Sequence, residues 1–410
     1  MKVELVYTPH LAEYRLSETH PLRPERFVLA VELMRAWGLL CDPEAEGGGG
    51  GAAVAGAGGA TDCARVVAPE PATETDLLRV HDATYIAAVR QAGANPAAYG
   101  GGFGIGPGDT PAFSHMHEVS AEIAGATIRA LDDVVAGEAL RAFSPAGGLH
   151  HAHRDHASGF CVYNDCAIAI AHTIAENPGL RVAYVDVDVH HGDGVQAAFY
   201  ARADVLTVSV HESGRYLFPG TGRAAETGSG AGVGFAVNLG LAPGADDVSY
   251  GLAFDAVIAP ALRAYSPDVI VAQLGADSHW ADPLGHIATT VEGQYRMAAR
   301  LVAVAEKVCG GRIVATGGGG YDTFSAVPRA WACALAALLC VHVPAELPDC
   351  WRLLAAEAAK RAGTVARLSR LTFDESGFGS EQEWGGDPLG ETQRAIARLR
   401  AEHPLLRQDA

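Results

Sequence analysis

The sequence lacks several features that define common classes of protein. None of its apolar runs reaches the roughly 18 to 20 residues that span a bilayer, and the longest candidate, Trp331 to Val343, has the length of a buried helix. The first ten residues, MKVELVYTPH, contain no apolar stretch of the kind found in secretory signals, and none of the eight cysteines belongs to a CxxC pair. We therefore expect a cytoplasmic protein with no membrane partner, whose cysteines are free thiols.

Positive charge is also scarce. The chain has 30 Lys and Arg against 48 Asp and Glu, which gives a net charge of −18. This balance opposes binding to bare nucleic acid, because the phosphate backbone requires a positive surface. The 410 residues, of which 49% are hydrophobic and 19% charged, are those of a globular protein with a large core.

The order of apolar runs predicts the fold class. Helical spacing is expected over 26–40, 73–92 with a break near 82–84, and 117–136, after a short strand at 3–7. Four short apolar runs then alternate with amphipathic segments; they are Arg181 to Val187, Val205 to Val210, Val269 to Leu274 and Arg312 to Thr316. Continuous apolar strands separated by helices indicate an α/β fold with a mainly parallel central sheet and helices on both faces.

The chain shows no clear linker between domains. We expect one catalytic domain over residues 1–345, with the low-complexity stretch 47–60 (GGGGGAAVAGAGGA) as a Gly/Ala-rich surface loop. Residues 346–410 are more polar and are expected to form a C-terminal helical extension.

Groups that can do chemistry follow each of the four runs. In open parallel sheets, ligands bind at the carboxyl ends of the strands. The residues at these ends are Asp186 to Gly194 (DVDVHHGDG), His211, Asp277 and Tyr321, and a turn of small residues before them ends in His150 and His151. Histidines confined to the surface would scatter, so this gathering predicts a site.

The DVDVHHGDG segment predicts a metal centre. If the strand continues through it, Asp186, Asp188 and His190 share one face, and burying these polar groups is costly unless a cation compensates them. Asp188, His190 and Asp277 would supply three ligands and leave a position open for water and substrate, as in catalytic metal sites. Hydrogen-bonded loops would explain any one of these residues, but not the set.

The histidine pair and the glycine run suggest the remaining catalytic groups. Asp186 and Asp193 are available to orient His150 and His151, which would raise their basicity. No GK[ST] follows Gly317 to Gly320, which excludes a P-loop. The glycines would instead let the Tyr321 hydroxyl reach a reacting carbonyl and stabilise its oxyanion, with a simple tight turn as the alternative.

Taken together, these motifs resemble the histone deacetylase superfamily, close to its class I enzymes. The resemblance covers about residues 5 to 345 and is carried by segments in matching order: HPLRPER (20–26), GGLHHA (147–152), SGFCVYND (158–165), YVDVDVHHGDG (184–194), LTVSVHE (206–212), FPGTG (218–222), QLGAD (273–277), DPLG (282–285) and GGGGY (317–321). It implies an arginase/deacetylase-like fold and metal-dependent hydrolysis of the acetyl amide of N-ε-acetyl-lysine in proteins, with a link to acetoin or acetate metabolism.

The resemblance also implies a role for particular residues. Asp188, His190 and Asp277 would bind Zn²⁺, with Fe²⁺ as an alternative. His151, oriented by Asp193, would be the general base and acid, His150 with Asp186 would tune charge, and Tyr321 would bind the substrate carbonyl. The substrate tunnel would be lined by Gly159, Phe160, Phe218 and Leu284, and Arg26 would line an acetate cavity. A structural K⁺ would be held by oxygens of Asp186, Asp188, His190, Ser209 and Val210.

One position departs from the family pattern. The resemblance would place a rim aspartate, which grips the substrate backbone, two residues before Tyr85, where this chain has Ala83. Asp82 is the nearest carboxylate and is a candidate for the rim. The expected partner is an acetylated protein, with an acyl-CoA synthetase as one candidate, and the sequence does not indicate an oligomeric state.

Three other functions compete with this one. An acetylpolyamine amidohydrolase would share the fold, and an acidic protein would suit its cationic substrate. A binuclear manganese ureohydrolase would need Asp-Ala-His-x-Asp, which the Asp188-Val-His190 arrangement with Tyr321 disfavours. A non-catalytic acyl-binding protein would be favoured by a degraded site, yet His150, His151 and Tyr321 are all present.

Overall fold

The structure, a computed structural model, describes residues 2–41, 63–374 and 386–409. Its strands are β1 (Val3–Val6), β2 (Arg65–Val67), β3 (Arg141–Ser144), β4 (Val182–Asp186), β5 (Val205–Glu212), β6 (Ala236–Leu241), β7 (Val269–Gln273) and β8 (Ile313–Thr316). They form one sheet in the order β2-β1-β3-β8-β7-β4-β5-β6, and every neighbouring pair is parallel. The predicted α/β class and parallel sheet are confirmed.

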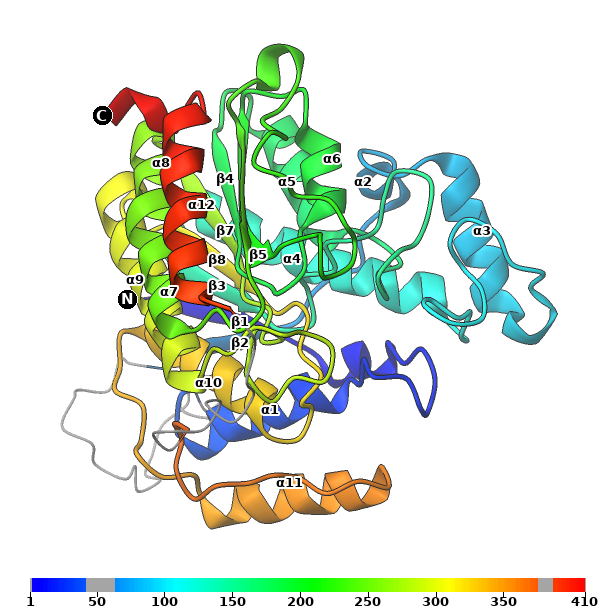
Figure 1. Ribbon diagram of the computed structural model, residues 1–410. Coiled ribbons are helices and arrows are strands. Elements are labelled where there is room, and N and C mark those ends of the chain that lie inside the picture. The colour runs from blue at the N-terminus through cyan, green and yellow to red at the C-terminus, as the bar shows by residue number, and fades with distance from the viewer. Residues whose placement is uncertain (1, 42–62, 375–385, 410) are drawn as a thin grey trace.

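Helices cover both faces of this sheet (Figure 1). They are α1 (Glu25–Ala36), α2 (Glu74–Leu77), α3 (Ala83–Ala94), α4 (Met116–Ala136), α5 (Asp165–Glu176), α6 (Asp193–Phe199), α7 (Asp247–Ala253), α8 (Ala259–Tyr265), α9 (Val291–Cys309), α10 (Ala326–Leu339), α11 (Asp349–Arg361) and α12 (Pro388–Glu402). Helices α4, α5 and α6 lie on one face, and α7 to α10 lie on the other. Among the described residues, no helix is both long and apolar enough to cross a bilayer.

The four central strands are apolar because both of their faces are covered. Every residue of β4 and β7 is buried, so neither strand shows the alternation of a half-exposed sheet. The sequence prediction missed β2, β3 and β6. Strand β2 has three residues, β3 contains the buried Arg141, and β6 contains Asn238 and Gly240. None of them is therefore a continuous apolar run.

Two expectations about strand ends are wrong. β4 ends at Asp186, so Asp188 and His190 lie in a loop and do not share a strand face with Asp186. His211 does not follow a strand but lies inside β5, where its ring bonds to Ser209 Oγ (2.8 Å) and the carbonyl of Gly222 (3.1 Å).

The prediction that all cysteines are free is also wrong. Cys41 and Cys63 form a disulfide, next to a parallel bridge between Leu40 and Ala64. Their separation of 22 residues hid the pair from an inspection for short cysteine spacings. The predicted surface loop at 47–60 lies outside the described residues.

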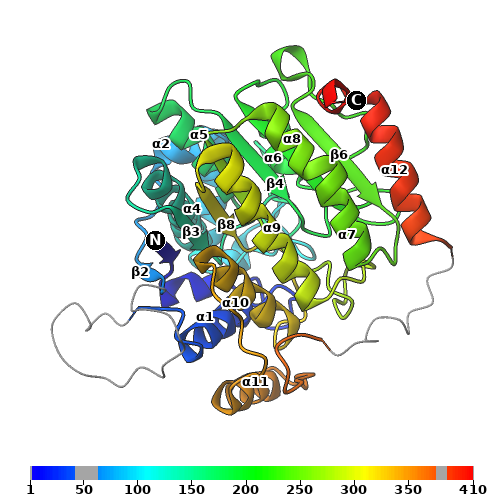
Figure 2. The ribbon, with the colours of Figure 1, turned by 90° about the vertical axis from the view of Figure 1, so that its left-hand side faces the viewer.

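The C-terminal segment is helical, as expected, and it packs closely against the rest of the chain. In α11, Trp351 is buried and its indole Nε1 donates to the carbonyl of Leu29 at 2.8 Å. Helix α12 packs against α7 and β6 (Figure 2), and His403 after it donates to the carbonyl of Ala236 at 2.8 Å. The segment therefore covers two separate parts of the core.

Candidate active site

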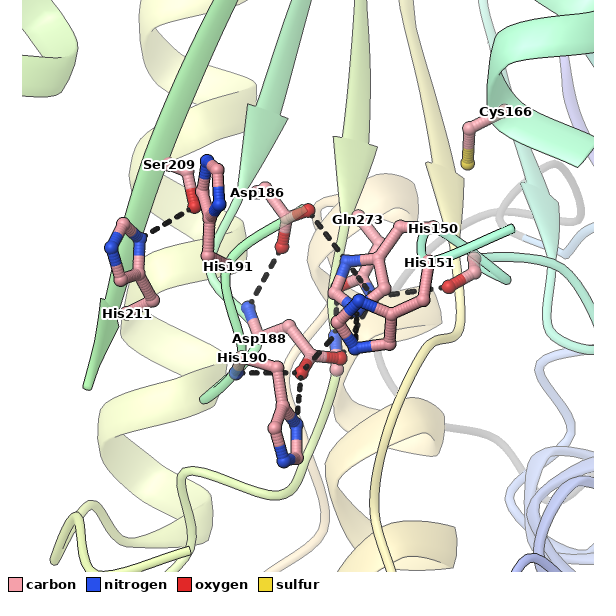
Figure 3. A network of polar contacts seen from close by, with 12 residues as sticks. His150, His151, Cys166, Asp186, Asp188, His190, His191, Ser209, His211 and Gln273 are labelled. Carbon is pink, nitrogen blue, oxygen red and sulfur yellow. Dashed lines mark hydrogen bonds and ion pairs between the residues drawn. The ribbon is translucent and has the colours of Figure 1, made fainter. Parts of the chain in front are cut away.

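The predicted metal ligands lie together beyond the carboxyl ends of β4 and β7. One ligand atom each from Asp188, His190 and Asp277 lies within 4.8 Å of the others, and all three residues are buried. Figure 3 shows Asp188 beside His190. Nδ1 of His190 is 3.1 Å from Asp188 Oδ1 and 3.0 Å from Asp277 Oδ2. The loop that follows β4 thus brings its ligands to the one that follows β7.

The backbone and a glutamine orient the two carboxylates. Asp188 Oδ2 accepts hydrogen bonds from Gln273 Nε2 and from Gly319 N, both at 2.7 Å, and Asp277 Oδ1 accepts one from Val189 N at 2.8 Å. The opposite oxygen of each carboxylate is the one that faces His190. A Cβ on Gly319 would lie 1.9 Å from Asp277 Oδ2, so this glycine is needed for the close approach.

This donor set fits a divalent cation. Asp188 and Asp277 are completely buried, and burial together with the charge of Asp188 raises the pKa of Asp277 to about 6. Two adjacent buried carboxylates are therefore unfavourable by themselves, and a cation would relieve both their desolvation and their repulsion. Two oxygens and one imidazole nitrogen suit zinc, and they also suit ferrous iron.

Each histidine of the HH pair has a carboxylate partner. His150 Nδ1 lies 2.8 Å from Asp186 Oδ2, and His151 Nδ1 lies 2.7 Å from Asp193 Oδ1 (Figure 3 shows the pair). Because an ionised carboxylate can only accept, both Nδ1 atoms carry a proton. The two Nε2 atoms are 3.0 Å apart, so one of them must donate to the other.

The charges around the pair decide which histidine donates. Burial opposes a charge on His150, but the carboxylates of Asp186 and Asp188 outweigh it and raise the pKa of His150 to about 9. Burial and the neighbouring charge of His150 lower the pKa of His151 to about 3. At neutral pH, His150 therefore carries both protons and His151 keeps a lone pair on Nε2.

Asp193 orients more than one ring. Its Oδ2 also lies 3.1 Å from His153 Nε2. Although burial opposes ionisation, the hydrogen bonds from His151 and His153 hold the pKa of Asp193 well below its usual range. Asp193 therefore stays ionised.

Three of the predicted tunnel residues lie beside His151 or Tyr321. The Phe218 ring centroid is 5.0 Å from that of His151, and the Phe160 ring centroid is 5.7 Å from that of Tyr321. A Cβ on Gly159 would lie 2.3 Å from the His151 ring. Leu284 donates its N–H to Asp282, whose other oxygen accepts the N–H of Tyr321 at 2.7 Å. One carboxylate therefore links the loop of Leu284 to that of Tyr321.

The buried Arg26 lies behind Tyr321. Its Nη1 donates to the carbonyl of Gly320 at 3.2 Å, and its guanidinium lies 5.1 Å from the Trp331 ring. Its Nε is buried and has no hydrogen-bond partner among the described residues. An anion in contact with this nitrogen would satisfy it.

The predicted potassium ligands are adjacent in the sheet. The register of β4 and β5 places Asp186 beside Ser209, followed by the buried Val210. Asp186 Oδ1 accepts from the N–H of Asp188 at 3.2 Å. These contacts bring the named residues together, and the presence of an ion stays a prediction.

A carboxylate at the tunnel mouth escaped the sequence prediction. Asp109 is exposed, and its Oδ2 accepts the N–H of Gly159 at 2.8 Å. Its carbonyl oxygen lies 3.2 Å from His20 Nε2, and the His20 ring is 4.5 Å from that of Phe160. Asp82, the candidate rim residue, instead accepts from Arg154 Nε at 2.8 Å. Asp109 stands alone in a glycine-rich stretch, so no motif marks it.

Comparison with known proteins shows the family of this chain. The histone deacetylase domain profile matches residues 20–338. The chain belongs to the histone deacetylase family. Members of this family are deacetylases, and the present deacetylase is accordingly a hydrolase.

Bacterial proteins named acetoin utilization protein AcuC are among its relatives. The deacetylase is 39% identical to the acetoin utilization protein AcuC of Bacillus subtilis over 348 residues, which cover 84% of each chain. It is 34% identical to AcuC of Staphylococcus xylosus over 349 residues, 84% of this chain and 85% of the other. The expected resemblance is thereby confirmed.

Solved structures agree with the fold. The crystal structure of a histone deacetylase homolog from Aquifex aeolicus matches with a TM-score of 0.78 and 26% identity, covering 97% of this chain and all of the other. A histone deacetylase homolog complexed with SAHA matches with a TM-score of 0.80 and 27% identity over the same shares. The arginase/deacetylase-like fold is thus confirmed.

Proposed function

We propose that this deacetylase hydrolyses the acetyl amide of N-ε-acetyl-lysine in proteins, using one divalent cation, zinc or ferrous iron, held by Asp188, His190 and Asp277. The observation that carries the proposal is the arrangement of Phe160, Phe218 and Gly159 around the buried ligand cluster. An acetylated lysine is long and neutral, so it suits a narrow site with aromatic walls and polar groups only at its end.

The ligand cluster defines the reacting centre. A cation bound there would polarise the amide carbonyl and lower the pKa of a nearby water. His151 then receives the proton of the attacking water on Nε2, which gives up its hydrogen bond from His150, because Asp193 keeps the proton of this ring on Nδ1. The same nitrogen later delivers that proton to the departing lysine amine, which restores the neutral ring.

Two other groups act on the charge that develops. Tyr321, close to Phe160, donates a hydrogen bond from its hydroxyl to the oxyanion; burial raises the pKa of Tyr321, so the hydroxyl stays protonated. His150, held by Asp186, places its positive charge 3.0 Å from His151 and favours the anionic transition state. Both contributions arise from groups that are already oriented before substrate binds.

The surrounding residues have supporting roles. Arg26, with its unpaired Nε, binds the acetate product behind Tyr321. A structural K⁺ held by oxygens of Asp186, Asp188, His190, Ser209 and Val210 would stabilise the loop that carries the metal ligands. At the mouth, Asp109 has a carboxylate oxygen available for a substrate backbone N–H, and it is a stronger candidate for the rim than Asp82, which pairs with Arg154.

The relatives support a proposal for the physiological setting. Similarity to acetoin utilization proteins supports a cytoplasmic role in acetoin or acetate metabolism. An acyl-CoA synthetase inactivated by lysine acetylation is a suitable protein partner, because its deacetylation would restore acetate activation.

The test compares substrate classes. The metal-loaded enzyme should hydrolyse acetyl-lysine peptides with a higher kcat/KM than acetylspermidine. A tenfold preference for acetylspermidine would instead establish the acetylpolyamine amidohydrolase. If purified enzyme loaded with zinc or ferrous iron binds an acetyl-lysine peptide and hydrolyses neither substrate, it is a non-catalytic acyl-binding protein.

A further inference from the structure

A large groove lies on the far side of the loop that carries Phe218. It has a volume of about 780 Å³ and is bounded by residues 213–225, the end of β6 and helix α12. Four arginines line it, Arg215 and Arg223 from the loop and Arg394 and Arg398 from α12, against one carboxylate, Glu391. In a chain with a net charge of −18, this is a local concentration of positive charge.

Little of this charge is neutralised by the chain itself. Arg215 and Arg223 are exposed and make no ion pair with any residue that the structure describes. Arg394 approaches Asp387 only to 3.7 Å, and Arg398 pairs with Glu402 at 3.2 Å. The planar guanidinium groups are suited to carboxylates, which they bind through two parallel hydrogen bonds.

Strand β6 forms one side of the groove. Strand β6 is the last strand of the sheet. Thr207 N donates to Phe235 O and Ser213 N donates to Leu241 O, so the odd-numbered residues of β6 direct their backbone groups toward β5. The even-numbered residues face outward, as the bond from His403 to Ala236 O shows.

Asn238 and Gly240 are the outward-facing residues of β6 in the groove, and of these Asn238 is 1% exposed and Gly240 is partly exposed. Helix α12 packs against β6, so this edge is too little exposed for a peptide to pair with it. The exposed arginines are therefore the groups that a ligand would contact.

The groove adjoins the tunnel. Phe218 lies two residues from Tyr216 and two from Gly220, both of which line the groove. Two residues of extended chain span at most about 7 Å. A protein that inserts an acetylated lysine beside Phe218 therefore brings its neighbouring backbone near the groove.

We infer that the arginines of this groove bind an acidic segment of the acetylated protein substrate. The inference rests on the proposed function, because that function gives the tunnel a protein substrate. The groove then helps to select which acetylated lysines are deacetylated. Segments rich in Asp and Glu near the lysine are bound, whereas basic segments are repelled.

The test uses two peptides that share one acetyl-lysine. One carries a nearby tract of alternating Asp and Glu, and the other carries a tract of Ser and Gln of the same length. Wild type should show a kcat/KM about tenfold higher for the acidic peptide, the scale expected of several exposed charge-assisted contacts. The double variant Arg223→Glu/Arg394→Glu should lose this ratio, and the neutral peptide reports any loss of folding or of the chemical step.

A matched control comes from the same helix. Arg400 is exposed on α12 and does not line the groove, so Arg400→Glu should keep the wild-type ratio.

Other outcomes separate this inference from the proposed function. A kcat/KM ratio of acidic to neutral peptide near one in wild type, or a ratio unchanged in the double variant, overturns binding of an acidic segment in the groove. The proposed deacetylase function would still stand. If neither peptide is hydrolysed, the proposed function fails, and binding of the acidic peptide measured by calorimetry still tests the groove. A single-stranded oligonucleotide that binds more tightly than the acidic peptide, and only through Arg223 and Arg394, would overturn the peptide assignment.

Discussion

The strand-end loops between residues 147 and 321 and the C-terminal segment after residue 345 contribute to this deacetylase in opposite ways. In the loops, polar residues are dense in the sequence, and they converge on one buried cluster. In the C-terminal segment, single residues far apart act at different places: Asp374 is buried against the core, and Arg394 and Arg398 line an exposed groove. Proximity and burial make the first set mutually dependent, whereas the residues of the second set are independent because they act at separate places.

The largest effect should come from breaking the ligand cluster. Asp277→Ala removes a buried carboxylate that faces His190, so we expect loss of the bound metal and a fall in kcat/KM on the order of 10³ or more. Elemental analysis of wild type should give one divalent metal per chain, and removal by a chelator should abolish activity until zinc or ferrous iron is returned. Activity that survives complete metal removal would contradict the ligand assignment.

Tyr321→Phe tests a contribution to the same cluster that does not depend on metal binding. The ring can still pack against Phe160, but the hydroxyl donor is lost, so kcat should fall by about 10²–10³ while the metal content stays unchanged. His151→Ala should reduce kcat at least as much, because it removes the proton carrier. Near wild-type turnover by Tyr321→Phe would mean that another group stabilises the oxyanion.

The sequence predicted the cluster well because motifs there are short and local. His150, His151, Asp188 and His190 stand in two segments, and a parallel sheet must bring the ends of its neighbouring strands together. The reasoning about alternation along β4 was wrong, since the strand ends at Asp186, but the loop delivers the same side chains. The chemistry of the residues was therefore a better guide than the assumed backbone.

The remaining features depend on long-range contacts that no local pattern records. Strand β6 contains Asn238 and Gly240, and its place at the sheet edge follows only from the fold. Asp109 meets Gly159 from 50 positions away, and the Cys41–Cys63 disulfide joins residues 22 apart. Such pairs become visible only once the chain is folded.

A smaller effect is expected at the mouth of the tunnel. Asp109→Ala should raise the KM for acetyl-lysine peptides about tenfold, with a smaller change in kcat, because it removes an exposed acceptor for the substrate backbone. Asp82→Ala, which loses a surface pair with Arg154, should change KM by less than about twofold. If Asp82→Ala raised KM more than Asp109→Ala, Asp82 would be the rim residue. Equal, negligible effects would mean that neither carboxylate grips the peptide.

The smallest effect on turnover is expected at Asp374. This residue tests how firmly the C-terminal segment is attached to the core. Its carboxylate accepts from His279 Nε2 (3.0 Å) and Val291 N (2.9 Å) and pairs with Arg329 at 3.0 Å, all in buried surroundings. Asp374→Asn keeps the size of the side chain and removes the charge opposite a buried guanidinium, so the free energy of unfolding should fall by about 3 kcal/mol.

The matched control for Asp374 is Asp349→Asn, in the same C-terminal segment. Asp349 pairs with Arg352 at the surface, and its loss should change the free energy of unfolding by less than about 1 kcal/mol. Urea denaturation measures both variants. Because Asp374 touches His279, two residues after the ligand Asp277, its variant should also lower kcat a few-fold, whereas Asp349→Asn should not. Equal, small losses of stability would mean that the C-terminal segment is attached only loosely, as its polar sequence alone would suggest.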